Sequence, residues 1–376
     1  MLEQLNGHDD PYPVYDQIRA QGALTRDGGL WATTSHSLVN KILRDRRFGV
    51  RYANGTYPGT PNVVSGSFLE LDPPDHTRLR RLATPAFSPK KIDEYRARVE
   101  KVADALLDQA GDEFDLITDY AAPLPIAVIS ELLGIPDADT GDFANYGRLV
   151  AQSFDGHFSP DIDRANERIF ALFERLIAER RARPGDDVIS SLVAAEAEQK
   201  LTVPELLSTL VLLLIAGFET TVNLIGNGVR ALLDHPKQWA FFKAYPDVAG
   251  AVVEETLRWA PPVHLTTRLA HEQITLLDKD IRADDGVYLL IAAANRDPEV
   301  YPEPDRFDLM RVQKPEHLAF SSGIHYCLGA TLARMEGEVA FRAVARRLPD
   351  LRQAGPAGHR DSVVIRGMVS YPVSRS

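Results

Sequence analysis

The single cysteine of the chain lies in a segment that could hold a metal ion. Cys327 stands in the stretch Phe320-Ser-Ser-Gly-Ile-His-Tyr-Cys-Leu-Gly, directly before a helix expected from about residue 328. The positive end of that helix and its free backbone N–H groups would stabilise a thiolate, the form of cysteine that ligates iron. Gly323 and Gly329 lack a Cβ atom and would let the backbone approach a flat ring closely. The alternative for an isolated cysteine is a buried structural thiol.

A second set of polar groups interrupts an apolar run. The stretch Ala216-Gly-Phe-Glu-Thr-Thr places a carboxylate and two hydroxyls among apolar residues. Because an unpaired acid is costly to bury, Glu219 needs a partner or a chemical role. The alternative for the hydroxyls is that Thr220 and Thr221 donate to carbonyls one turn earlier and merely bend the helix.

One long helix must position these polar groups. Thr202 and Glu205 form a capping-box pattern, and the helix can run over residues 202–233 before His235-Pro236 ends it. About 30 residues at a rise of 1.5 Å each give a length of roughly 45 Å. Because its centre is apolar on every side, we expect this helix to pass through the interior of the protein.

The other expected elements are mostly helical. Asp27-Gly28-Gly29 predicts a hairpin turn, and Ser88-Pro89 predicts the start of an amphipathic helix. Further patterns predict helices at 126–133, 169–181 and 248–259, short strands within 266–292, an irregular stretch at 297–307 and a terminal hairpin over 363–373 around Gly367.

Composition restricts the class of protein. The 376 residues are 44% hydrophobic and 25% charged, which is typical of a large packed core. A net charge of -11 argues against nucleic acid or anionic lipid as the main partner. The first residues have no signal-peptide pattern, and the apolar run 210–218 is shorter than the roughly 20 residues that cross a bilayer. We therefore expect a cytoplasmic protein without a membrane partner.

Both polar segments resemble signatures of the cytochrome P450 family. The haem-ligand loop of that family reads Phe-Gly-x-Gly-x-His-x-Cys-x-Gly, and this chain matches five of its six fixed positions, with Ser321 in place of the first glycine. Ala216-Gly-Phe-Glu-Thr-Thr is similar to the family's Ala-Gly-x-Asp/Glu-Thr-Thr segment. The resemblance implies a mainly α fold with a smaller β-rich region, in which a long central helix covers a buried haem within a single domain of residues 1–376.

The resemblance also implies roles at the cofactor. Cys327 would ligate the iron of haem b, and Glu219 and Thr220 would relay protons to dioxygen. His76 and Arg80 are four residues apart, hence on one helical face, where they could contact a haem propionate or form a solvated basic face. The remaining haem-binding positions implied by the family are Arg268, His325, Phe320, Gly329, Ala216 and Gly217.

Outside the cofactor site, the resemblance implies structural, substrate and docking residues. Glu255, Arg258 and Arg306 would brace the fold behind the cysteine. The residues expected around the substrate are Val263, His264, Leu265 and Met368. Those expected near a docking surface for an electron donor are Arg78, Arg81 and Arg334.

The implied activity is that of a bacterial, soluble monooxygenase. It would insert one oxygen atom from O2 into a mid-sized hydrophobic substrate such as a terpenoid, steroid, macrolide or aromatic natural product. The chain shows no reductase-like segment, so electrons from NAD(P)H would arrive through a separate ferredoxin reductase and ferredoxin, and we expect a monomer. The alternatives are a peroxide-driven enzyme of the same fold, which can manage without the acid and alcohol, and a non-catalytic haem-binding accessory protein.

Overall fold

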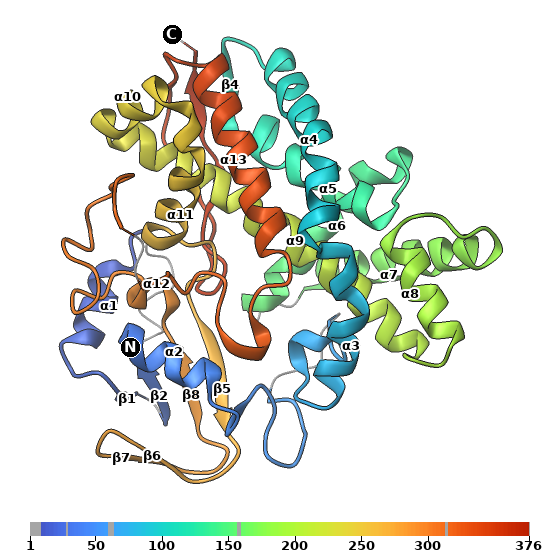
Figure 1. The fold of residues 1–376 in the computed structure, drawn as a ribbon, viewed down its shortest axis with the longest axis vertical. Helices are drawn as coiled ribbons and strands as arrows, with labels where there is room; N and C mark the ends of the chain where they lie inside the picture. The colour runs from blue at the N-terminus through green and yellow to red at the C-terminus, as the bar shows by residue number, and fades with distance from the viewer. Residues whose placement is uncertain (1–8, 28, 59–63, 156–158, 313–314, 376) are drawn as a thin grey trace.

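The computed structural model describes residues 9–27, 29–58, 64–155, 159–312 and 315–375. Helices form most of the molecule; most of the labelled strands gather at the lower end of the view, and one lies near the opposite end (Figure 1). The α-helices are α1 (Tyr12–Arg19), α2 (His36–Arg44), α3 (Asp75–Ala83), α4 (Pro89–Gln109), α5 (Pro123–Leu133), α6 (Asp137–Ala151), α7 (Pro160–Ala182), α8 (Val188–Ala197), α9 (Val203–Asp234), α10 (Pro236–Ala244), α11 (Ala249–Trp259), α12 (Ile291–Ala294) and α13 (Ala330–Arg347).

The expected helices are present, with ends shifted by a few residues. α4 begins at Pro89 after Ser88 as N-cap, as the Ser-Pro pair predicts. α5, α7 and α11 contain the three predicted apolar patterns, and α13 starts two residues later than expected. The haem-loop candidate therefore leads directly into α13.

The main sheet joins the start of the chain to its later β segments. Its strands are β1 (Thr25–Asp27), β2 (Leu30–Thr33), β3 (Phe48–Gly49), β5 (Thr266–Ala270) and β8 (Gly286–Leu289), in the order β1-β2-β8-β5-β3. β2 and β8 are parallel, and the other neighbours are antiparallel. Asp27 pairs with Leu30, which confirms the hairpin predicted there.

The predicted terminal hairpin over residues 363–373 is wrong. β11 (Met368–Ser370) pairs with the earlier β10 (Gly358–His359), and β12 (Pro372–Ser374) lies between β4 (Glu113–Asp115) and β9 (Arg352–Gln353). The remaining pair is β6 (Ile274–Leu276) with β7 (Lys279–Ile281). The strands at the chain end therefore take their partners from outside the predicted segment.

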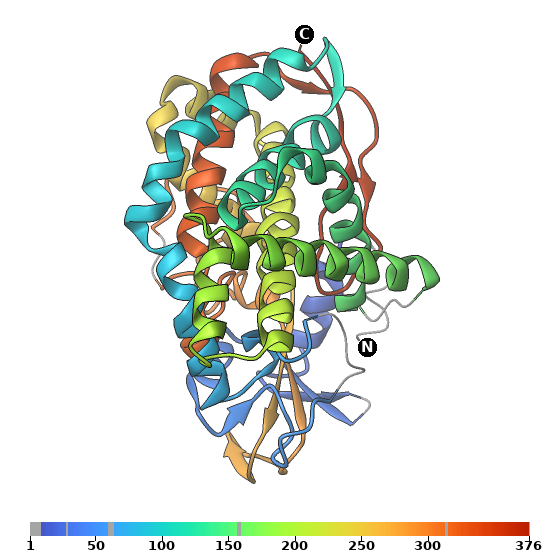
Figure 2. The same ribbon diagram turned by 90° about the vertical axis from the view of Figure 1, so that its right-hand side faces the viewer.

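α9 is the central element, as predicted. Thr202 accepts from the backbone of Glu205 and the Glu205 side chain accepts in return, so the capping box is complete. By length and hydropathy α9 would pass as a membrane span, but 83% of its most apolar window is buried inside the protein. Figure 2 shows it running through the middle of the helical part, with other helices on both sides.

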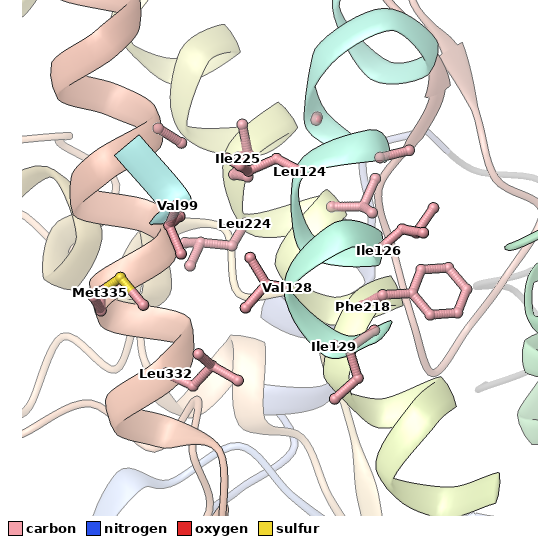
Figure 3. Packing of buried hydrophobic residues seen from close by; sticks show 14 of the residues in the cluster. Val99, Leu124, Ile126, Val128, Ile129, Phe218, Leu224, Ile225, Leu332 and Met335 are labelled. Carbon is pink, nitrogen blue, oxygen red and sulfur yellow. The ribbon is translucent and has the colours of Figure 1, made fainter. Parts of the chain in front are cut away.

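The largest hydrophobic cluster forms around α9. Figure 3 shows Leu224 and Ile225 of α9, Val128 of α5 and Met335 of α13 meeting in this cluster, with Val99 of α4 beside them. All five side chains are at most 3% exposed. Because α5, α9 and α13 share one core, the polar segment of α9 and the cysteine loop before α13 are held in a fixed relation.

Candidate functional site

The cysteine loop is a tight turn that packs on α2. The Cys327 backbone N donates to Phe320 O at 2.9 Å, which closes the loop over a short 3-10 turn of residues 323–325. Gly323 has a φ of +69°, and a Cβ there would lie 2.3 Å from the carbonyl oxygen of Leu43. Glycine is therefore required both by backbone conformation and by close contact with α2.

Ser321 takes a conformation that suits the glycine of the family pattern. Its φ is +61°, in the left-handed region that side chains disfavour. Its Oγ is buried without a hydrogen-bond partner among the described residues. The departure from the family pattern therefore preserves the turn at the expense of local strain.

Interactions of two kinds shift the pKa of the Cys327 thiol in opposite directions. Burial raises its pKa, whereas the backbone N–H of Gly329 and the charges of Arg80 and Arg334 lower it. These three groups are therefore the protein's means of stabilising an anionic sulfur once a metal replaces the proton.

Four cationic or imidazole groups gather beside the cysteine loop, and we call them the basic cradle: His76, Arg80, Arg268 and His325. The rings of His76 and His325 are 4.4 Å apart between centroids. Burial, followed by the charges of Arg268, His76 and Arg80, lowers the pKa of His325 to about 2. Burial also lowers the pKa of Arg268 to about 10. Like charges at this depth favour an anionic ligand.

The basic cradle fits the propionates of a haem. Both ring nitrogens of His76 and Nε2 of His325 are buried without a hydrogen-bond partner among the described residues. A Cβ built on Gly329 meets no atom within 4 Å, so the backbone beside Cys327 leaves room for a flat ring. Two carboxylates and a planar macrocycle would satisfy these groups together. The structure thus brings together the predicted cysteine and the predicted propionate contacts.

One face of α9 remains accessible although the helix is otherwise buried. Ala216 is exposed and Gly217 and Thr220 are half-buried, whereas Thr221 is buried. Thr220 Oγ1 donates to Ala216 O at 2.9 Å, and Thr221 Oγ1 donates to Gly217 O at 3.3 Å. Both hydroxyls thus donate to carbonyls one turn earlier, as expected if their role were only structural. Thr220 is nevertheless accessible enough to contact a ligand.

Gly217 has a packing role that its motif does not reveal. A Cβ there would lie 2.8 Å from Cδ1 of Ile129, which projects from α5. Close approach of α5 and α9 thus requires a residue without a side chain at this position.

Glu219 is buried and paired. Its carboxylate forms an ion pair with Arg360, which follows β10 near the chain end, and the two side chains are 5% and 10% exposed. Arg360 could not be predicted from the sequence, because no local pattern links a residue after β10 to the middle of α9. Arg360 is therefore the partner that the buried carboxylate of Glu219 requires.

The expected structural group needs a correction. Arg258 donates to both oxygens of Glu255 at 2.8 Å, and both side chains are buried. The second arginine on Glu255 is Arg311, at 3.1 Å, and not Arg306. Arg306 is 54% exposed, pairs with Glu303, and offers only its carbonyl to Arg258. Its side chain turns outward although its backbone belongs to the group.

The four expected substrate residues do not form one group. His264 is buried with Nδ1 2.9 Å from the Tyr15 hydroxyl, and Leu265 belongs to the same cluster near α1. Both side chains thus lie against the start of the chain, and a direct polar contact between His264 and a substrate stays a prediction. Val263 makes a β-bridge with Ile365, and Met368 packs near Gly226 of α9. Met368 is the best placed of the four beside α9.

The three arginines expected at a docking surface have different surroundings. Arg78 pairs with Glu205 at 2.6 Å, at the start of α9. Arg334 pairs with Glu254 at 2.6 Å and lies over the ring of Phe320 at 4.5 Å. Arg81 is exposed. Two of the three thus have acidic partners, and docking of an electron donor at these arginines stays a prediction.

Comparisons with known proteins agree with this architecture. The family model described as Cytochrome P450 matches residues 247–348. The cytochrome P450 monooxygenase PikC of Streptomyces venezuelae is 39% identical, over 97% of this chain and 91% of that protein. The biotin biosynthesis cytochrome P450 of Bacillus subtilis is 37% identical, over 92% and 91%. The crystal structure of P450BioI in complex with an acyl carrier protein ligated to hexadec-9Z-enoic acid superposes with a TM-score of 0.90 at 36% identity, over 97% and 98%.

A mainly helical fold with a cysteine loop beside a buried helix defines a haem-dependent oxidoreductase class. The chain belongs to the cytochrome P450 family. It is therefore a bacterial-type cytochrome P450 enzyme, a haem monooxygenase, and its fold class is confirmed by the structural superposition.

Proposed function

We propose that Cys327 ligates the haem iron and that the basic cradle binds the haem propionates. The observation that carries this proposal is the set of buried, unpartnered imidazole nitrogens of His76 and His325 beside the buried guanidinium of Arg268. When bound, the haem supplies the activation of dioxygen by two electrons, and thiolate donation favours O–O cleavage. Phe320 and Gly329 would border the macrocycle on the cysteine side, and Ala216 and Gly217 on the α9 side.

Within that arrangement, Thr220 and Glu219 deliver protons. Thr220 is the accessible hydroxyl on the face of α9 that includes Ala216; its single proton would turn from Ala216 O to a ligand on that face. Glu219, the next residue, would replace each proton from the protein side. This acid and alcohol favour use of O2 over the peroxide-driven alternative, since peroxide already carries its protons and electrons.

The substrate is a mid-sized hydrophobic molecule, free or bound to a carrier protein. Met368 packs beside Gly226 of α9, and we expect it to supply an apolar wall to the substrate site. A carrier-bound substrate is suggested by P450BioI, whose crystal structure holds an acyl carrier protein. Electrons would come from NAD(P)H through a ferredoxin reductase and a ferredoxin, to a monomeric enzyme in the cytoplasm.

The test is the absorption spectrum of the reduced protein under carbon monoxide. We expect the long-wavelength Soret band that gives the family its name, and we expect Cys327→Ser to lose it while Ser322→Ala retains it. A wild-type band at the position typical of histidine-ligated haem would contradict thiolate ligation. Haem-free protein after reconstitution would contradict the proposal.

A further inference from the structure

The turn formed by β10 and β11 lies along one stripe of α9. Its contacts with the helix fall on Glu219, Asn223, Gly226 and Arg230, which are four, three and four residues apart. Positions with that spacing share one helical face. The chain end and the centre of α9 are therefore joined over several turns of the helix.

The individual contacts are close. Gly367 approaches so near that a Cβ there would lie 1.9 Å from Asn223 Oδ1. Met368 Cε lies 3.4 Å from the position of a Cβ on Gly226. At the outer end, His359 Nε2 lies 3.0 Å from Nη1 of Arg230. This fit holds Arg360, the residue after β10, against the helix.

Arg360 fixes the carboxylate of Glu219 next to the accessible face of α9. Its backbone N donates to Gly367 O at 3.0 Å, so the backbone of Arg360 is itself anchored. The side chains of the ion pair are 10% and 5% exposed, a depth at which a carboxylate without a cation is costly. Thr220 follows Glu219 by one residue, about 100° around the helix. The carboxylate is thus held at the edge of the face that includes Thr220.

We propose that Arg360 is a positioning residue for proton delivery, acting through Glu219. This inference rests on the proposed function, in which Glu219 replaces the protons used at Thr220. Without Arg360, the carboxylate of Glu219 would lose its fixed position. The rate of proton delivery would then no longer match the rate of electron delivery. Dioxygen that takes up two electrons and two protons without O–O cleavage leaves as hydrogen peroxide, so electrons are lost from product formation.

The test compares product formed and peroxide released per NADH consumed, with a surrogate ferredoxin system. We expect Arg360→Met to lower the product share several-fold, to raise the peroxide share, and to change the solvent deuterium isotope effect on product formation. Arg360→Lys should restore most of the product share, because it keeps the positive charge. Arg230→Met is the matched control: it removes the other polar anchor of the same turn without touching Glu219, and it should behave like the wild type.

An unchanged product share in Arg360→Met would overturn the proposal, as would equal losses in Arg360→Met and Arg230→Met. A double-mutant cycle on urea unfolding, with Glu219→Gln, Arg360→Met and the double variant, tests the ion pair independently of turnover. Non-additive midpoints support the pair, and additive midpoints overturn it. If the wild type shows no thiolate spectrum or no product, the proposed function fails instead, and the unfolding cycle still reports on the pair.

Discussion

At the scale of single residues, the cysteine loop contains a strained position that can be relieved. Ser321 has a φ of +61°, which costs a residue with a Cβ atom about 1–2 kcal/mol. Glycine removes that strain but gains freedom in the unfolded chain, worth about 0.4–1 kcal/mol. We therefore expect Ser321→Gly to raise the free energy of unfolding by roughly 0.5–1 kcal/mol, measured by urea titration.

The neighbouring serine supplies the control for this prediction. Ser322 has a φ of -152°, which is extended backbone that any residue adopts. Ser322→Gly should therefore lower the free energy of unfolding, because glycine adds freedom to the unfolded chain and relieves no strain. Equal effects of the two substitutions would show that the backbone conformation of Ser321 is not the cause.

The pairing of Glu255 with Arg311 leads to a second prediction for single residues. Arg311→Met removes a charged hydrogen bond from a buried carboxylate and should cost about 1.5–3 kcal/mol of unfolding free energy. Arg306→Met should cost less than about 1 kcal/mol, because its side chain pairs at the surface. Urea unfolding of the two variants under the same conditions measures the difference. A larger cost for Arg306→Met would restore the assignment made from the sequence.

Residue types and spacing pointed to Cys327, to Glu219 and to the pair His76 and Arg80, because each belongs to a short segment with a constrained local pattern. Arg268 and His325 came only from the resemblance to the family. Arg306 was implied by the resemblance of its segment to the family, and no local pattern pointed to Arg311 in the irregular chain that follows. In such a stretch no helical or strand period decides which side chain turns inward. No local sequence pattern could predict the contact of Arg360 with Glu219, since the position of Arg360 depends on the packing of the chain end against α9.

At the scale of elements, Glu254 ties α11 to α13. Arg334 Nε lies 2.6 Å and His317 Nε2 lies 3.3 Å from its carboxylate oxygens. Burial by itself would raise the pKa of Glu254, but the interactions with His317 and Arg334 outweigh it and lower the pKa to about 2. The pKa of Glu254 in the folded protein thus lies below its ordinary value of 4.5. Stability from this group is complete above that value and is lost as the pH falls toward about 2.

We expect Glu254→Gln to lower the free energy of unfolding by about 2 kcal/mol at neutral pH, allowing for the partial exposure of the carboxylate. The difference from the wild type should shrink as the pH falls and should vanish near pH 2. Urea unfolding across this range measures it. Glu299→Gln is the control, because Glu299 is an exposed acid on the surface. A difference that is independent of pH would contradict the role of the ionised carboxylate.

The elements themselves were predictable to different degrees. α9 could be located from its capping box and from the proline after His235, because these signals are local. The strands at the chain end could not, because β12 takes β4 and β9 as partners and β11 takes β10. Strands of two or three residues contain too little alternation to specify a register, so the packing of remote segments decides it.

At the scale of the whole molecule, the basic cradle lies where two hydrophobic clusters meet. His76 and Arg80 belong to α3, whose buried face joins the cluster around α9, whereas Arg268 belongs to β5, which packs in the cluster of the main sheet. Repulsion among these groups opposes the junction of the two parts. An anion bound between them would therefore stabilise the molecule as a whole rather than one element.

This arrangement predicts that the carboxylates of haem, and not only its ring, stabilise the fold. A ligand that binds only the folded protein raises its stability in proportion to the logarithm of the ligand concentration over Kd. Haem added to apoprotein should therefore raise the thermal midpoint, and haem dimethyl ester, whose propionates are neutral, should raise it much less. Arg268→Met should reduce the effect of haem toward that of the ester, whereas Arg282→Met, at an exposed arginine, should leave it unchanged. Equal midpoints with haem and its ester would mean that the basic cradle binds no propionate, because a neutral ester cannot relieve repulsion between the guanidinium groups of Arg80 and Arg268.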